Sequence, residues 1–546
     1  MRTATRRLGA LAGLVAAAVA LGVAELLAAF VGPSSSPLTA VAGEIVDRLP
    51  RSAEQFGVQT FGHWDKPLLT AIVLVVLAGV AALAGILAVR RIGFGLGVIA
   101  LFAVIGGLAT YARPDSTSVA IVPTLVGAVV AMGTLPALIR RAQGAVTAAT
   151  DDAEVADSQR TAEPAGVGGT AGSAPGSSST EFDFAGAGDA TRRRFLLFAG
   201  GAAGAAVVAG GTGRLVSKWR GVGDRRAAIR LPAASSPAPA VPAGAELNVP
   251  GLTPLLTPNG SFYRVDTAFV LPQVDPDGWR LRIHGRARRE LTLTYADLLK
   301  RPLIERDVTL TCVSNDVGGN LIGSARWLGV RLADLLAEVE PDEDADQLVG
   351  RSADGWTCGT PTAACRDGRD ALLAVGMNGK PLPVAHGFPV RMVVPGLYGY
   401  VSATKWLVDL ELSRFSDFDA YWVPRGWSQQ APIKTSSRID TPHQSGKVDA
   451  GRVVVAGVAW AQHRGIAKVE VRVDEGAWQE ATLAAADSVD TWRQWRWDWD
   501  AKAAGSGRHT LEVRATDTTG IPQSGTSAAP APNGSEGWHH ISVVVR

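Results

Sequence analysis

Five long apolar stretches in the first 211 residues restrict the possible folds more than any other feature of the chain. They cover residues 8–30, 68–89, 92–112, 119–139 and 195–211. A membrane-spanning helix needs about 20 apolar residues, so the first four stretches are long enough and the fifth is short for this role. Glu25 is the only charged residue inside them. The sequence therefore predicts a multi-pass α-helical membrane region, with four transmembrane helices in residues 1–141.

Arginines flank these stretches on one predicted side of the membrane. They are Arg2, Arg6, Arg7, Arg90, Arg91, Arg140 and Arg141. Because cytoplasmic loops carry an excess of positive charge, this pattern predicts a cytoplasmic N-terminus. With the fifth helix included, residues 212–546 are expected outside the cytoplasm, on the outer side of the cell membrane.

Residues 142–190 are rich in Ala, Gly, Ser and Thr, a composition that predicts a disordered cytoplasmic linker. The sequence "TRRRFLLFAG" follows, in which Thr191, Arg192, Arg193, Phe195 and Leu196 fit a twin-arginine export signal. A plain fifth transmembrane helix is the alternative, and both interpretations of residues 191–213 give the same topology. Residues 214–246 are predicted to be a Pro/Ala-rich linker.

The remaining sequence divides into two predicted domains. Residues 247–430 mix strand-like runs with helical spacing, as in "VRLADLLAEV", which predicts an α+β domain. In residues 431–546 the alternation becomes strict, for example at Val469, Val471 and Val473. Short alternating strands of this kind predict an immunoglobulin-like β-sandwich. The net charge of +2, without a basic stripe, argues against a nucleic-acid partner.

The three cysteines lie in the α+β domain. Cys358 and Cys365 are close enough in sequence to form a small disulfide loop, which would leave Cys312 alone. Their spacing does not fit a zinc site. Cys312 follows a strand-like run and precedes "SNDVGG", and strand periodicity places it on the same face as Val308 and Leu310. It could be a buried free thiol or a nucleophile, and a soft thiolate also suits a soft metal centre.

Several motifs between residues 250 and 546 together resemble the sulfite oxidase superfamily of molybdopterin enzymes. They are "SFYRVDTAFV", "WRLRIHG", "LTCVSN", "ARWLGVRLADLL", "MNGKPLPVAHGFPVRMVVPGLYGYVSATKWL", "GVAWAQHRGIAKVEVRVDEGAWQEA" and "LEVRATDTTG". The resemblance implies a molybdenum-molybdopterin cofactor with Cys312 as the protein ligand of the metal. It also implies that residues 247–430 form a molybdopterin-binding oxidoreductase domain.

The resemblance further implies which residues contact the cofactor. Those along the pterin or around its polar or phosphate end would be Phe262, Tyr263, Arg264, His386, Arg391, Gly399, Tyr400, Val401 and Lys405, with Asn315 and Ser352 as weaker candidates. Arg464 would keep one cationic position of the catalytic pocket. The chain departs from sulfite oxidases at Val317, where the family carries arginine, and no tyrosine aligns with their active-site tyrosine. Sulfite and a sulfoxide therefore both stay open as substrates.

The resemblance implies an oxidoreductase that transfers an oxygen atom and two electrons, so a redox partner is required. The chain lacks the C-x-x-C-H haem motif and has no histidine in the predicted spans, which favours a separate cytochrome or quinone. The last domain matches one that forms dimers in many relatives, which implies a homodimer. The alternative function is a membrane-tethered β-sandwich binding module whose α+β domain holds no cofactor.

Overall fold

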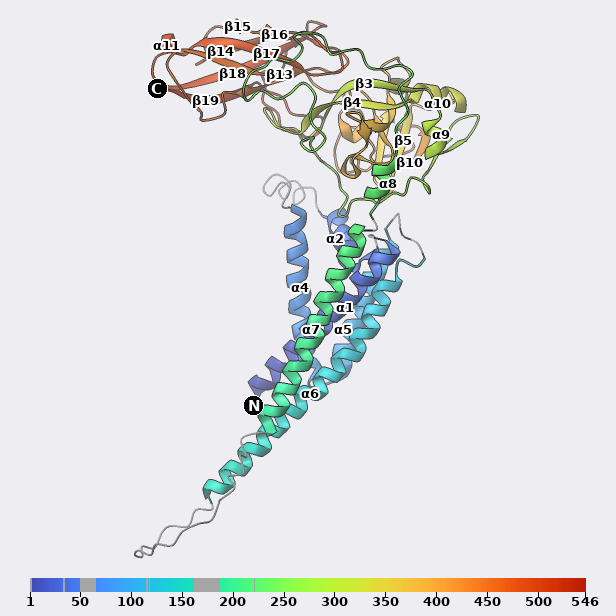
Figure 1. Ribbon diagram of the computed structural model, residues 1–546, viewed down its shortest axis with the longest axis vertical. Helices are drawn as coiled ribbons and strands as arrows, with labels where there is room; N and C mark the ends of the chain where they lie inside the picture. Colours follow the sequence, from blue (N-terminus) through green and yellow to red (C-terminus); the bar gives the residue numbers. More distant parts are fainter. Residues whose placement is uncertain are drawn as a thin grey trace, which may run out of the picture. The chain divides into compact units, whose positions relative to one another are not determined.

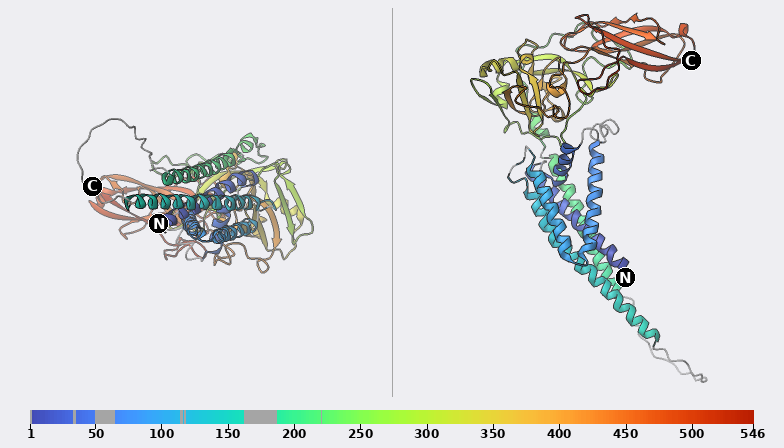
Figure 2. Two further views of the ribbon diagram at one scale, coloured as in Figure 1. Left: turned by 90° about the horizontal axis from the view of Figure 1, so that it is seen from below. Right: turned by 180° about the vertical axis from the view of Figure 1, so that it is seen from behind.

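A computed structural model describes residues 2–32, 35–49, 65–113, 116, 118–161, 187–219 and 221–546. The chain forms two compact units, Met1–Gly221 and Val222–Arg546. The first unit is helical, and the second contains all the strands of the described residues (Figures 1 and 2).

The N-terminal unit contains the five apolar stretches as long helices. The helices of this unit are α1 (Arg2–Val31), α2 (Pro37–Arg48), α4 (Asp65–Ala88), α5 (Ile92–Tyr111), α6 (Val122–Thr161) and α7 (Ala187–Trp219). Alanines of α1 pack with Leu135 and Leu138 of α6 and with Phe195 of α7 in one buried cluster. Among the described residues, α1, α4, α5, α6 and α7 are long and apolar enough to cross a membrane. The prediction of five apolar helices is confirmed, and α2 was not predicted.

The predicted disordered linker at residues 142–190 is wrong in its first part. Helix α6 continues to Thr161, well beyond the apolar stretch that ends near residue 139. Residues 142–161 are rich in alanine, which has the highest intrinsic helix propensity and can extend a helix that has already formed. Residues 162–186 of the predicted linker lie outside the described residues, and the twin-arginine-like sequence lies within α7.

The prediction of a linker at residues 214–246 is also wrong for its larger part, because residues 222–246 belong to the second unit. Helix α8 (Gly223–Ala228) carries Arg226, whose guanidinium donates to the carbonyl of Leu382 at 2.7 Å. Beyond it, the backbone of Ser236 accepts a hydrogen bond from the Glu305 amide at 2.9 Å. The extended Pro/Ala-rich segment covers part of a sheet edge, which otherwise has unpaired backbone groups.

The α+β domain consists of two five-stranded sheets. One has the order β2-β1-β10-β5-β6 and the other the order β3-β4-β7-β8, with β9 paired to β7. Their strands are β1 (Arg280–Gly285), β2 (Leu291–Thr294), β3 (Leu303–Thr311), β4 (Ile322–Arg331), β5 (Gln347–Ser352), β6 (Thr357–Pro361), β7 (Leu372–Met377), β8 (Lys380–Pro381), β9 (Arg391–Val393) and β10 (Leu407–Ser413). All pairs are antiparallel except β1 with β10.

Short helices connect these strands. They are α9 (Tyr295–Leu299), α10 (Leu332–Val339) and the 3₁₀ turns η3 (Thr362–Cys365), η4 (Val384–His386) and η5 (Gly399–Val401). Helix α9 begins at a capping box formed by Thr294 and Asp297. The predicted apolar face of α10, which includes Leu335 and Val339, is fully buried. The periodicity of the sequence therefore predicted α10 correctly.

The C-terminal region contains two further sheets, with the orders β11-β13-β17-β16 and β12-β19-β18-β14-β15. Their strands are β11 (Ser436–Thr441), β12 (Lys447–Val448), β13 (Arg452–Trp460), β14 (Ile466–Val473), β15 (Gln479–Glu480), β16 (Thr482–Leu483), β17 (Arg493–Asp500), β18 (Gly507–Asp517) and β19 (His539–Val545), with helix α11 (Ala501–Ala504) after β17. Val455, Trp495 and Val513 from both sheets share one buried core. Hereafter residues 431–546 are called the C-terminal domain.

Candidate active site

Cys312 directly follows strand β3, at the start of a tight turn. Its amide donates to the carbonyl of Leu321 at 2.9 Å, and its own carbonyl accepts from the Asn315 amide at 3.1 Å. Val308 and Leu310 on the same face of β3 lie in a buried cluster that includes Phe262. The thiol is a partly buried free cysteine. Burial raises its pKa, while hydrogen bonds from Ser314 and the charge of Lys405 act in the opposite direction.

The other two cysteines are free thiols, so the disulfide that their spacing allowed is not formed. Cys358 lies on β6 and Cys365 at the end of η3, and both are buried. The sulfur of Cys358 lies 3.5 Å from the hydroxyl of Thr360. Cys312 is therefore the one cysteine of the chain that is not fully enclosed by the core.

Three basic side chains gather near Cys312 from the segment 386–405. His386 lies in η4, Arg391 begins β9, and Lys405 precedes β10. Arg391 is 4% exposed, and its guanidinium donates only to the carbonyls of Met392, His386 and Ala403 at 3.2–3.5 Å. Within the part of the chain that the structure describes, Arg391 has no carboxylate partner. This buried positive charge is therefore not neutralised by the protein.

Burial shifts the pKa values of all three groups. Burial lowers the pKa of Arg391 to about 10. Burial also lowers the pKa of His386 to about 4, and the charges of Arg391 and Lys405 add to this effect. The pKa of Lys405 falls to about 8 because of burial, although Asp266 opposes the shift. Positive charge on these groups is costly because they are buried, so their surroundings favour an anion nearby.

Asp266 is the carboxylate of this group. It accepts from the Lys405 ammonium at 2.6 Å and from the Arg264 guanidinium at 2.8 Å. Asp266 thus pairs with Arg264 and Lys405, whereas Arg391 has no carboxylate partner among the described residues. We call Arg264, His386, Arg391 and Lys405 the cation cluster. Asp266 was missed in the sequence, although it stands in the motif "SFYRVDTAFV" that supplied its neighbours.

Two aromatic rings lie near both the cation cluster and Cys312. Phe262 stacks on Tyr263 with a centroid distance of 5.2 Å and meets the His386 ring edge-on at 5.5 Å. Burial raises the pKa of the Tyr263 phenol, and the negative charge of a Cys312 thiolate adds to this effect. The structure thus brings Phe262, Tyr263, His386 and Cys312 together.

The loop of Gly399, Tyr400 and Val401, called the glycine loop below, passes close to the end of β3. A Cβ atom at Gly399 would lie 3.8 Å from the carbonyl oxygen of Thr311 and 4.0 Å from the Tyr263 hydroxyl. The side chain of Tyr400 turns elsewhere, because its hydroxyl donates to the Ser428 carbonyl at 2.6 Å. Val401 is buried, and its carbonyl accepts from the Thr360 hydroxyl. Only the backbone of this loop is therefore close to Cys312.

These residues fit a molybdenum–molybdopterin group on two independent grounds. A thiol is the kind of ligand that a soft metal centre prefers, and Cys312 lies close enough to Lys405 for the lysine charge to lower its pKa. A buried guanidinium without a carboxylate is costly unless an anion compensates it, and an arginine fork suits a phosphate. The Cys312 thiol and the buried Arg391 together match the two ends of such a group.

Comparison with known proteins agrees with this geometry. Residues 268–422 match the family model described as an oxidoreductase molybdopterin binding domain. Mitochondrial sulfite oxidase of Rattus norvegicus is 31% identical over 343 residues, which cover 53% of this chain and 62% of that protein. The human mitochondrial sulfite oxidase is 30% identical over 341 residues, with the same shares covered. The chain therefore contains an oxidoreductase molybdopterin binding domain and is similar to sulfite oxidases over about half of its length.

Two further similarities extend beyond the mitochondrial enzymes. The uncharacterized oxidoreductase YuiH of Bacillus subtilis is 29% identical over 167 residues, which cover 31% of this chain and 81% of that protein. Among solved structures, the sulfane dehydrogenase SoxCD of Paracoccus pantotrophus is 22% identical, with a TM-score of 0.47 over 53% of this chain and 81% of that one. The chain spans about 62% of the length of the mitochondrial relatives that it matches.

Two residues predicted for the site, Asn315 and Arg464, have structural partners of their own, and a third, Ser352, is buried. Asn315 closes the cysteine loop, since its side-chain oxygen accepts from the Leu321 amide at 2.7 Å. Ser352 ends β5 and is buried. Arg464 forms an ion pair with Asp517 at 2.8 Å and also donates to the Ile433 carbonyl at 3.0 Å. Arg464 is therefore neutralised by the C-terminal domain and stands apart from the cation cluster.

Tyr398 lies near Cys312 and was not named in the sequence analysis. It is 5% exposed, and its phenol interacts with the Cys312 thiolate, which together with the larger effect of burial raises its pKa to about 12. Gly534 lies against its ring, so closely that a Cβ there would be 2.4 Å from the hydroxyl oxygen. Tyr398 directly precedes the glycine loop that was singled out, and only the fold shows which residue of "PGLYGY" turns inward.

Proposed function

We propose that the protein is a membrane-anchored, molybdenum-dependent oxidoreductase of the sulfite oxidase type, with Cys312 as the metal ligand. The observation that carries this proposal is the partly buried Cys312 thiol together with the buried Arg391, which has no carboxylate partner among the described residues. The match to the molybdopterin binding domain and the similarity to sulfite oxidases support a molybdenum-molybdopterin cofactor. When bound, such a group supplies a two-electron oxygen-atom transfer.

The chain's own residues would bind and orient that group. Arg391 and Lys405 would pair with its phosphate end, and both can donate several hydrogen bonds to phosphate oxygens. Phe262 and Tyr263 would pack along its ring system. Tyr398 and Tyr263 would place two phenol groups near the metal, where their raised pKa values keep them protonated as hydrogen-bond donors.

The substrate is sulfite-like or a sulfoxide in this proposal. Val317 stands where sulfite oxidases carry arginine, and it lies against Gly537 of the C-terminal domain. Arg464 is already paired with Asp517. A screen of sulfite oxidation against sulfoxide reduction, with an artificial electron carrier, would distinguish the two. A separate cytochrome or the quinone pool would supply or accept the electrons one at a time.

The five apolar helices support membrane anchoring, and their flanking arginines favour a catalytic unit outside the cytoplasm. The two sheets of the C-terminal domain are consistent with an immunoglobulin-like sandwich of the kind that forms homodimers in relatives. Reporter fusions after Arg141 and after Trp219 would test the topology. A cytoplasmic reporter at Trp219 would contradict it.

The decisive experiment is the molybdenum content of purified protein. We expect stoichiometric metal in the wild type, none in Cys312→Ser, and wild-type metal in Cys365→Ser, which alters a buried thiol outside the site. A wild type without molybdenum, from cells that make the cofactor, would overturn the proposal. It would favour instead a tethered binding module with a cofactor-free domain.

A further inference from the structure

Strand β3 directly precedes Cys312, and its two edges pair with different segments of the chain. One edge pairs with β4 along its whole length, from Leu303 opposite Val330 to Thr311 opposite Ile322. At the other edge, the first residues of β3 meet the segment around Ser236. The last residues, just before Cys312, meet the C-terminal domain. The metal-ligand end of the strand is therefore held by a different domain from its beginning.

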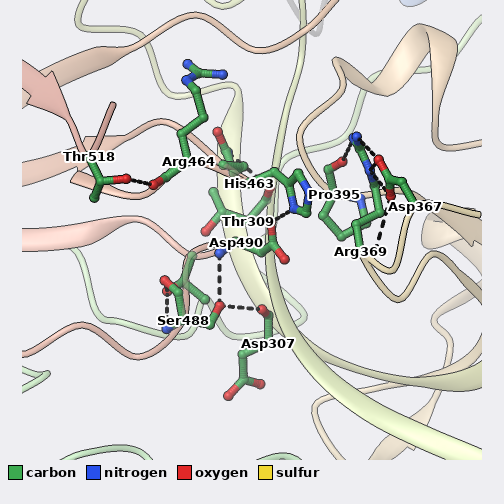
Figure 3. Close-up of polar contacts among 12 residues, drawn as sticks. Asp307, Thr309, Asp367, Arg369, Pro395, His463, Arg464, Ser488, Asp490 and Thr518 are labelled. Carbon is green, nitrogen blue, oxygen red and sulfur yellow. Dashed lines mark hydrogen bonds and ion pairs between the residues drawn. The ribbon is translucent and has the colours of Figure 1, made fainter. Parts of the chain in front are cut away.

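All three polar groups of Thr309 bind the C-terminal domain. Its amide donates to the Asp490 carbonyl at 2.9 Å, and its hydroxyl accepts from the Trp492 amide at 2.8 Å. Its carbonyl accepts from the side chain of Gln462 at 3.0 Å. Figure 3 shows Thr309 beside Asp490, with the Ser488 hydroxyl bound to the Asp307 carbonyl further along the same strand.

Gln462 is the residue of this interface that lies nearest to Cys312 along β3. It follows β13 and is 0% exposed. The same side-chain nitrogen that binds Thr309 also donates to the hydroxyl of Thr311 at 2.9 Å, one residue before Cys312. Because water cannot reach this position, neither bond can be replaced by solvent when the amide is removed.

The C-terminal domain also holds the loop that follows Cys312. The Ser535 hydroxyl donates to the Asn315 carbonyl at 2.7 Å, and the Arg438 guanidinium donates to the Gly319 carbonyl at 2.7 Å. Gly318 has a positive φ of 76°, and a Cβ there would lie 2.1 Å from the His539 ring. Cys312 is thus fixed on both sides by the C-terminal domain.

We propose that the C-terminal domain completes the active site by fixing the position of the Cys312 thiol, with Gln462 as the positioning residue. This inference rests on the proposed function in that it takes Cys312 as the metal ligand. It assigns the domain a role within the catalytic unit of a single chain, in addition to any part in dimer formation. As a consequence, a substitution of Gln462, which is 0% exposed and lies in the C-terminal domain, alters the position of the Cys312 thiol.

The test compares two buried glutamines of the C-terminal domain. Gln462→Met removes the two bonds to β3. Gln494→Met is the matched control: Gln494 is 1% exposed and also binds the α+β domain, at the Thr253 carbonyl and the Leu247 amide, but among the described residues its side chain forms no hydrogen bond with β3. Both variants lose buried hydrogen bonds across the same domain boundary, so both should lose thermal stability to a similar degree.

The first measurement is the rate at which a maleimide reagent modifies Cys312 in cofactor-free protein. We expect this rate to rise about fivefold or more in Gln462→Met and to stay at the wild-type value in Gln494→Met. The buried Cys358 and Cys365 serve as internal references for general unfolding. Equal Cys312 rates in both variants, or equal acceleration at all three cysteines, would overturn the proposal.

The second measurement is the thiolate-to-molybdenum absorption band of the loaded protein. This band should shift in Gln462→Met but not in Gln494→Met. Thr311→Val keeps a β-branched residue on the strand and removes only the bond nearest Cys312. It should shift the band in the same direction, and it keeps the test valid where Gln462→Met does not fold. Absence of molybdenum from the wild type would refute the proposed function but leave the maleimide result standing.

Discussion

Arg391 and Arg464 show two ways in which this protein accommodates an arginine near its candidate site. Arg391 is almost fully buried and donates only to backbone carbonyls. Arg464 is paired with Asp517, whose side chain is 1% exposed. Burial favours the neutral form of Asp517, but hydrogen bonds from Thr519, Arg464 and other donors lower its pKa to about 2. The comparison indicates that the unpaired arginine, Arg391, is the one available to the proposed cofactor. The paired arginine, Arg464, has a structural role.

The largest effect that would test this comparison is expected for Arg391→Met. Removing the buried guanidinium should reduce molybdenum content below about a tenth of the wild-type value, because the proposed contact of this side chain with a phosphate would be lost. Elemental analysis of purified protein measures this directly. Arg464→Met is the matched control and should retain its metal. Full metal content in Arg391→Met would refute the distinction between the two arginines.

The next effect concerns stability. Arg464→Met leaves the buried carboxylate of Asp517 without its charged partner, so we expect the free energy of unfolding to fall by about 2 to 3 kcal/mol. Urea denaturation of the catalytic unit in detergent-solubilised protein measures this change. Asp517→Asn should lower stability similarly, and the double variant should lose less than the sum. A strictly additive double variant would contradict a coupled pair.

A smaller effect is expected from His386 in cofactor-free protein. Its pKa is about 4 in the folded state, below its ordinary value of 6.5, so the unfolded chain binds more protons between these two pH values. Stability should therefore fall by up to about 2.5 kcal/mol as the pH drops from 6.5 to 4 through this residue alone. His386→Gln should remove that part of the pH dependence. Identical slopes for the two proteins would show that the pKa of His386 is the same in the folded and unfolded states.

The smallest effect is expected for Ser352→Ala. The Ser352 hydroxyl is buried and lacks a hydrogen-bond partner in the part of the chain that the structure describes. Its removal should change the stability of cofactor-free protein by less than about 0.5 kcal/mol, since no bond is broken. Molybdenum content separates two outcomes. Unchanged metal would remove Ser352 from the cofactor site, and reduced metal would place it there.

The sequence predicted the elements of the fold where local pattern decides them. The apolar stretches predicted all five long helices, and the leucines of α10 predicted its buried face. The linker at residues 214–246 was misjudged because composition alone cannot show that an edge of β3 is available for pairing. The helix beyond residue 142 was missed because a low apolar content does not prevent an alanine-rich segment from continuing an existing helix.

For the candidate site, the sequence by itself determined the chemical groups: Cys312 after a strand-like run, and the basic and aromatic residues of two motifs. The tertiary structure decided which charges stay unpaired. Asp266 partners Lys405, and Asp517 partners Arg464, over 53 residues of chain or more. It also decided that the C-terminal domain holds the end of β3. These outcomes depend on contacts between distant segments, and hydrogen bonds between distant segments leave no periodic signal in the sequence.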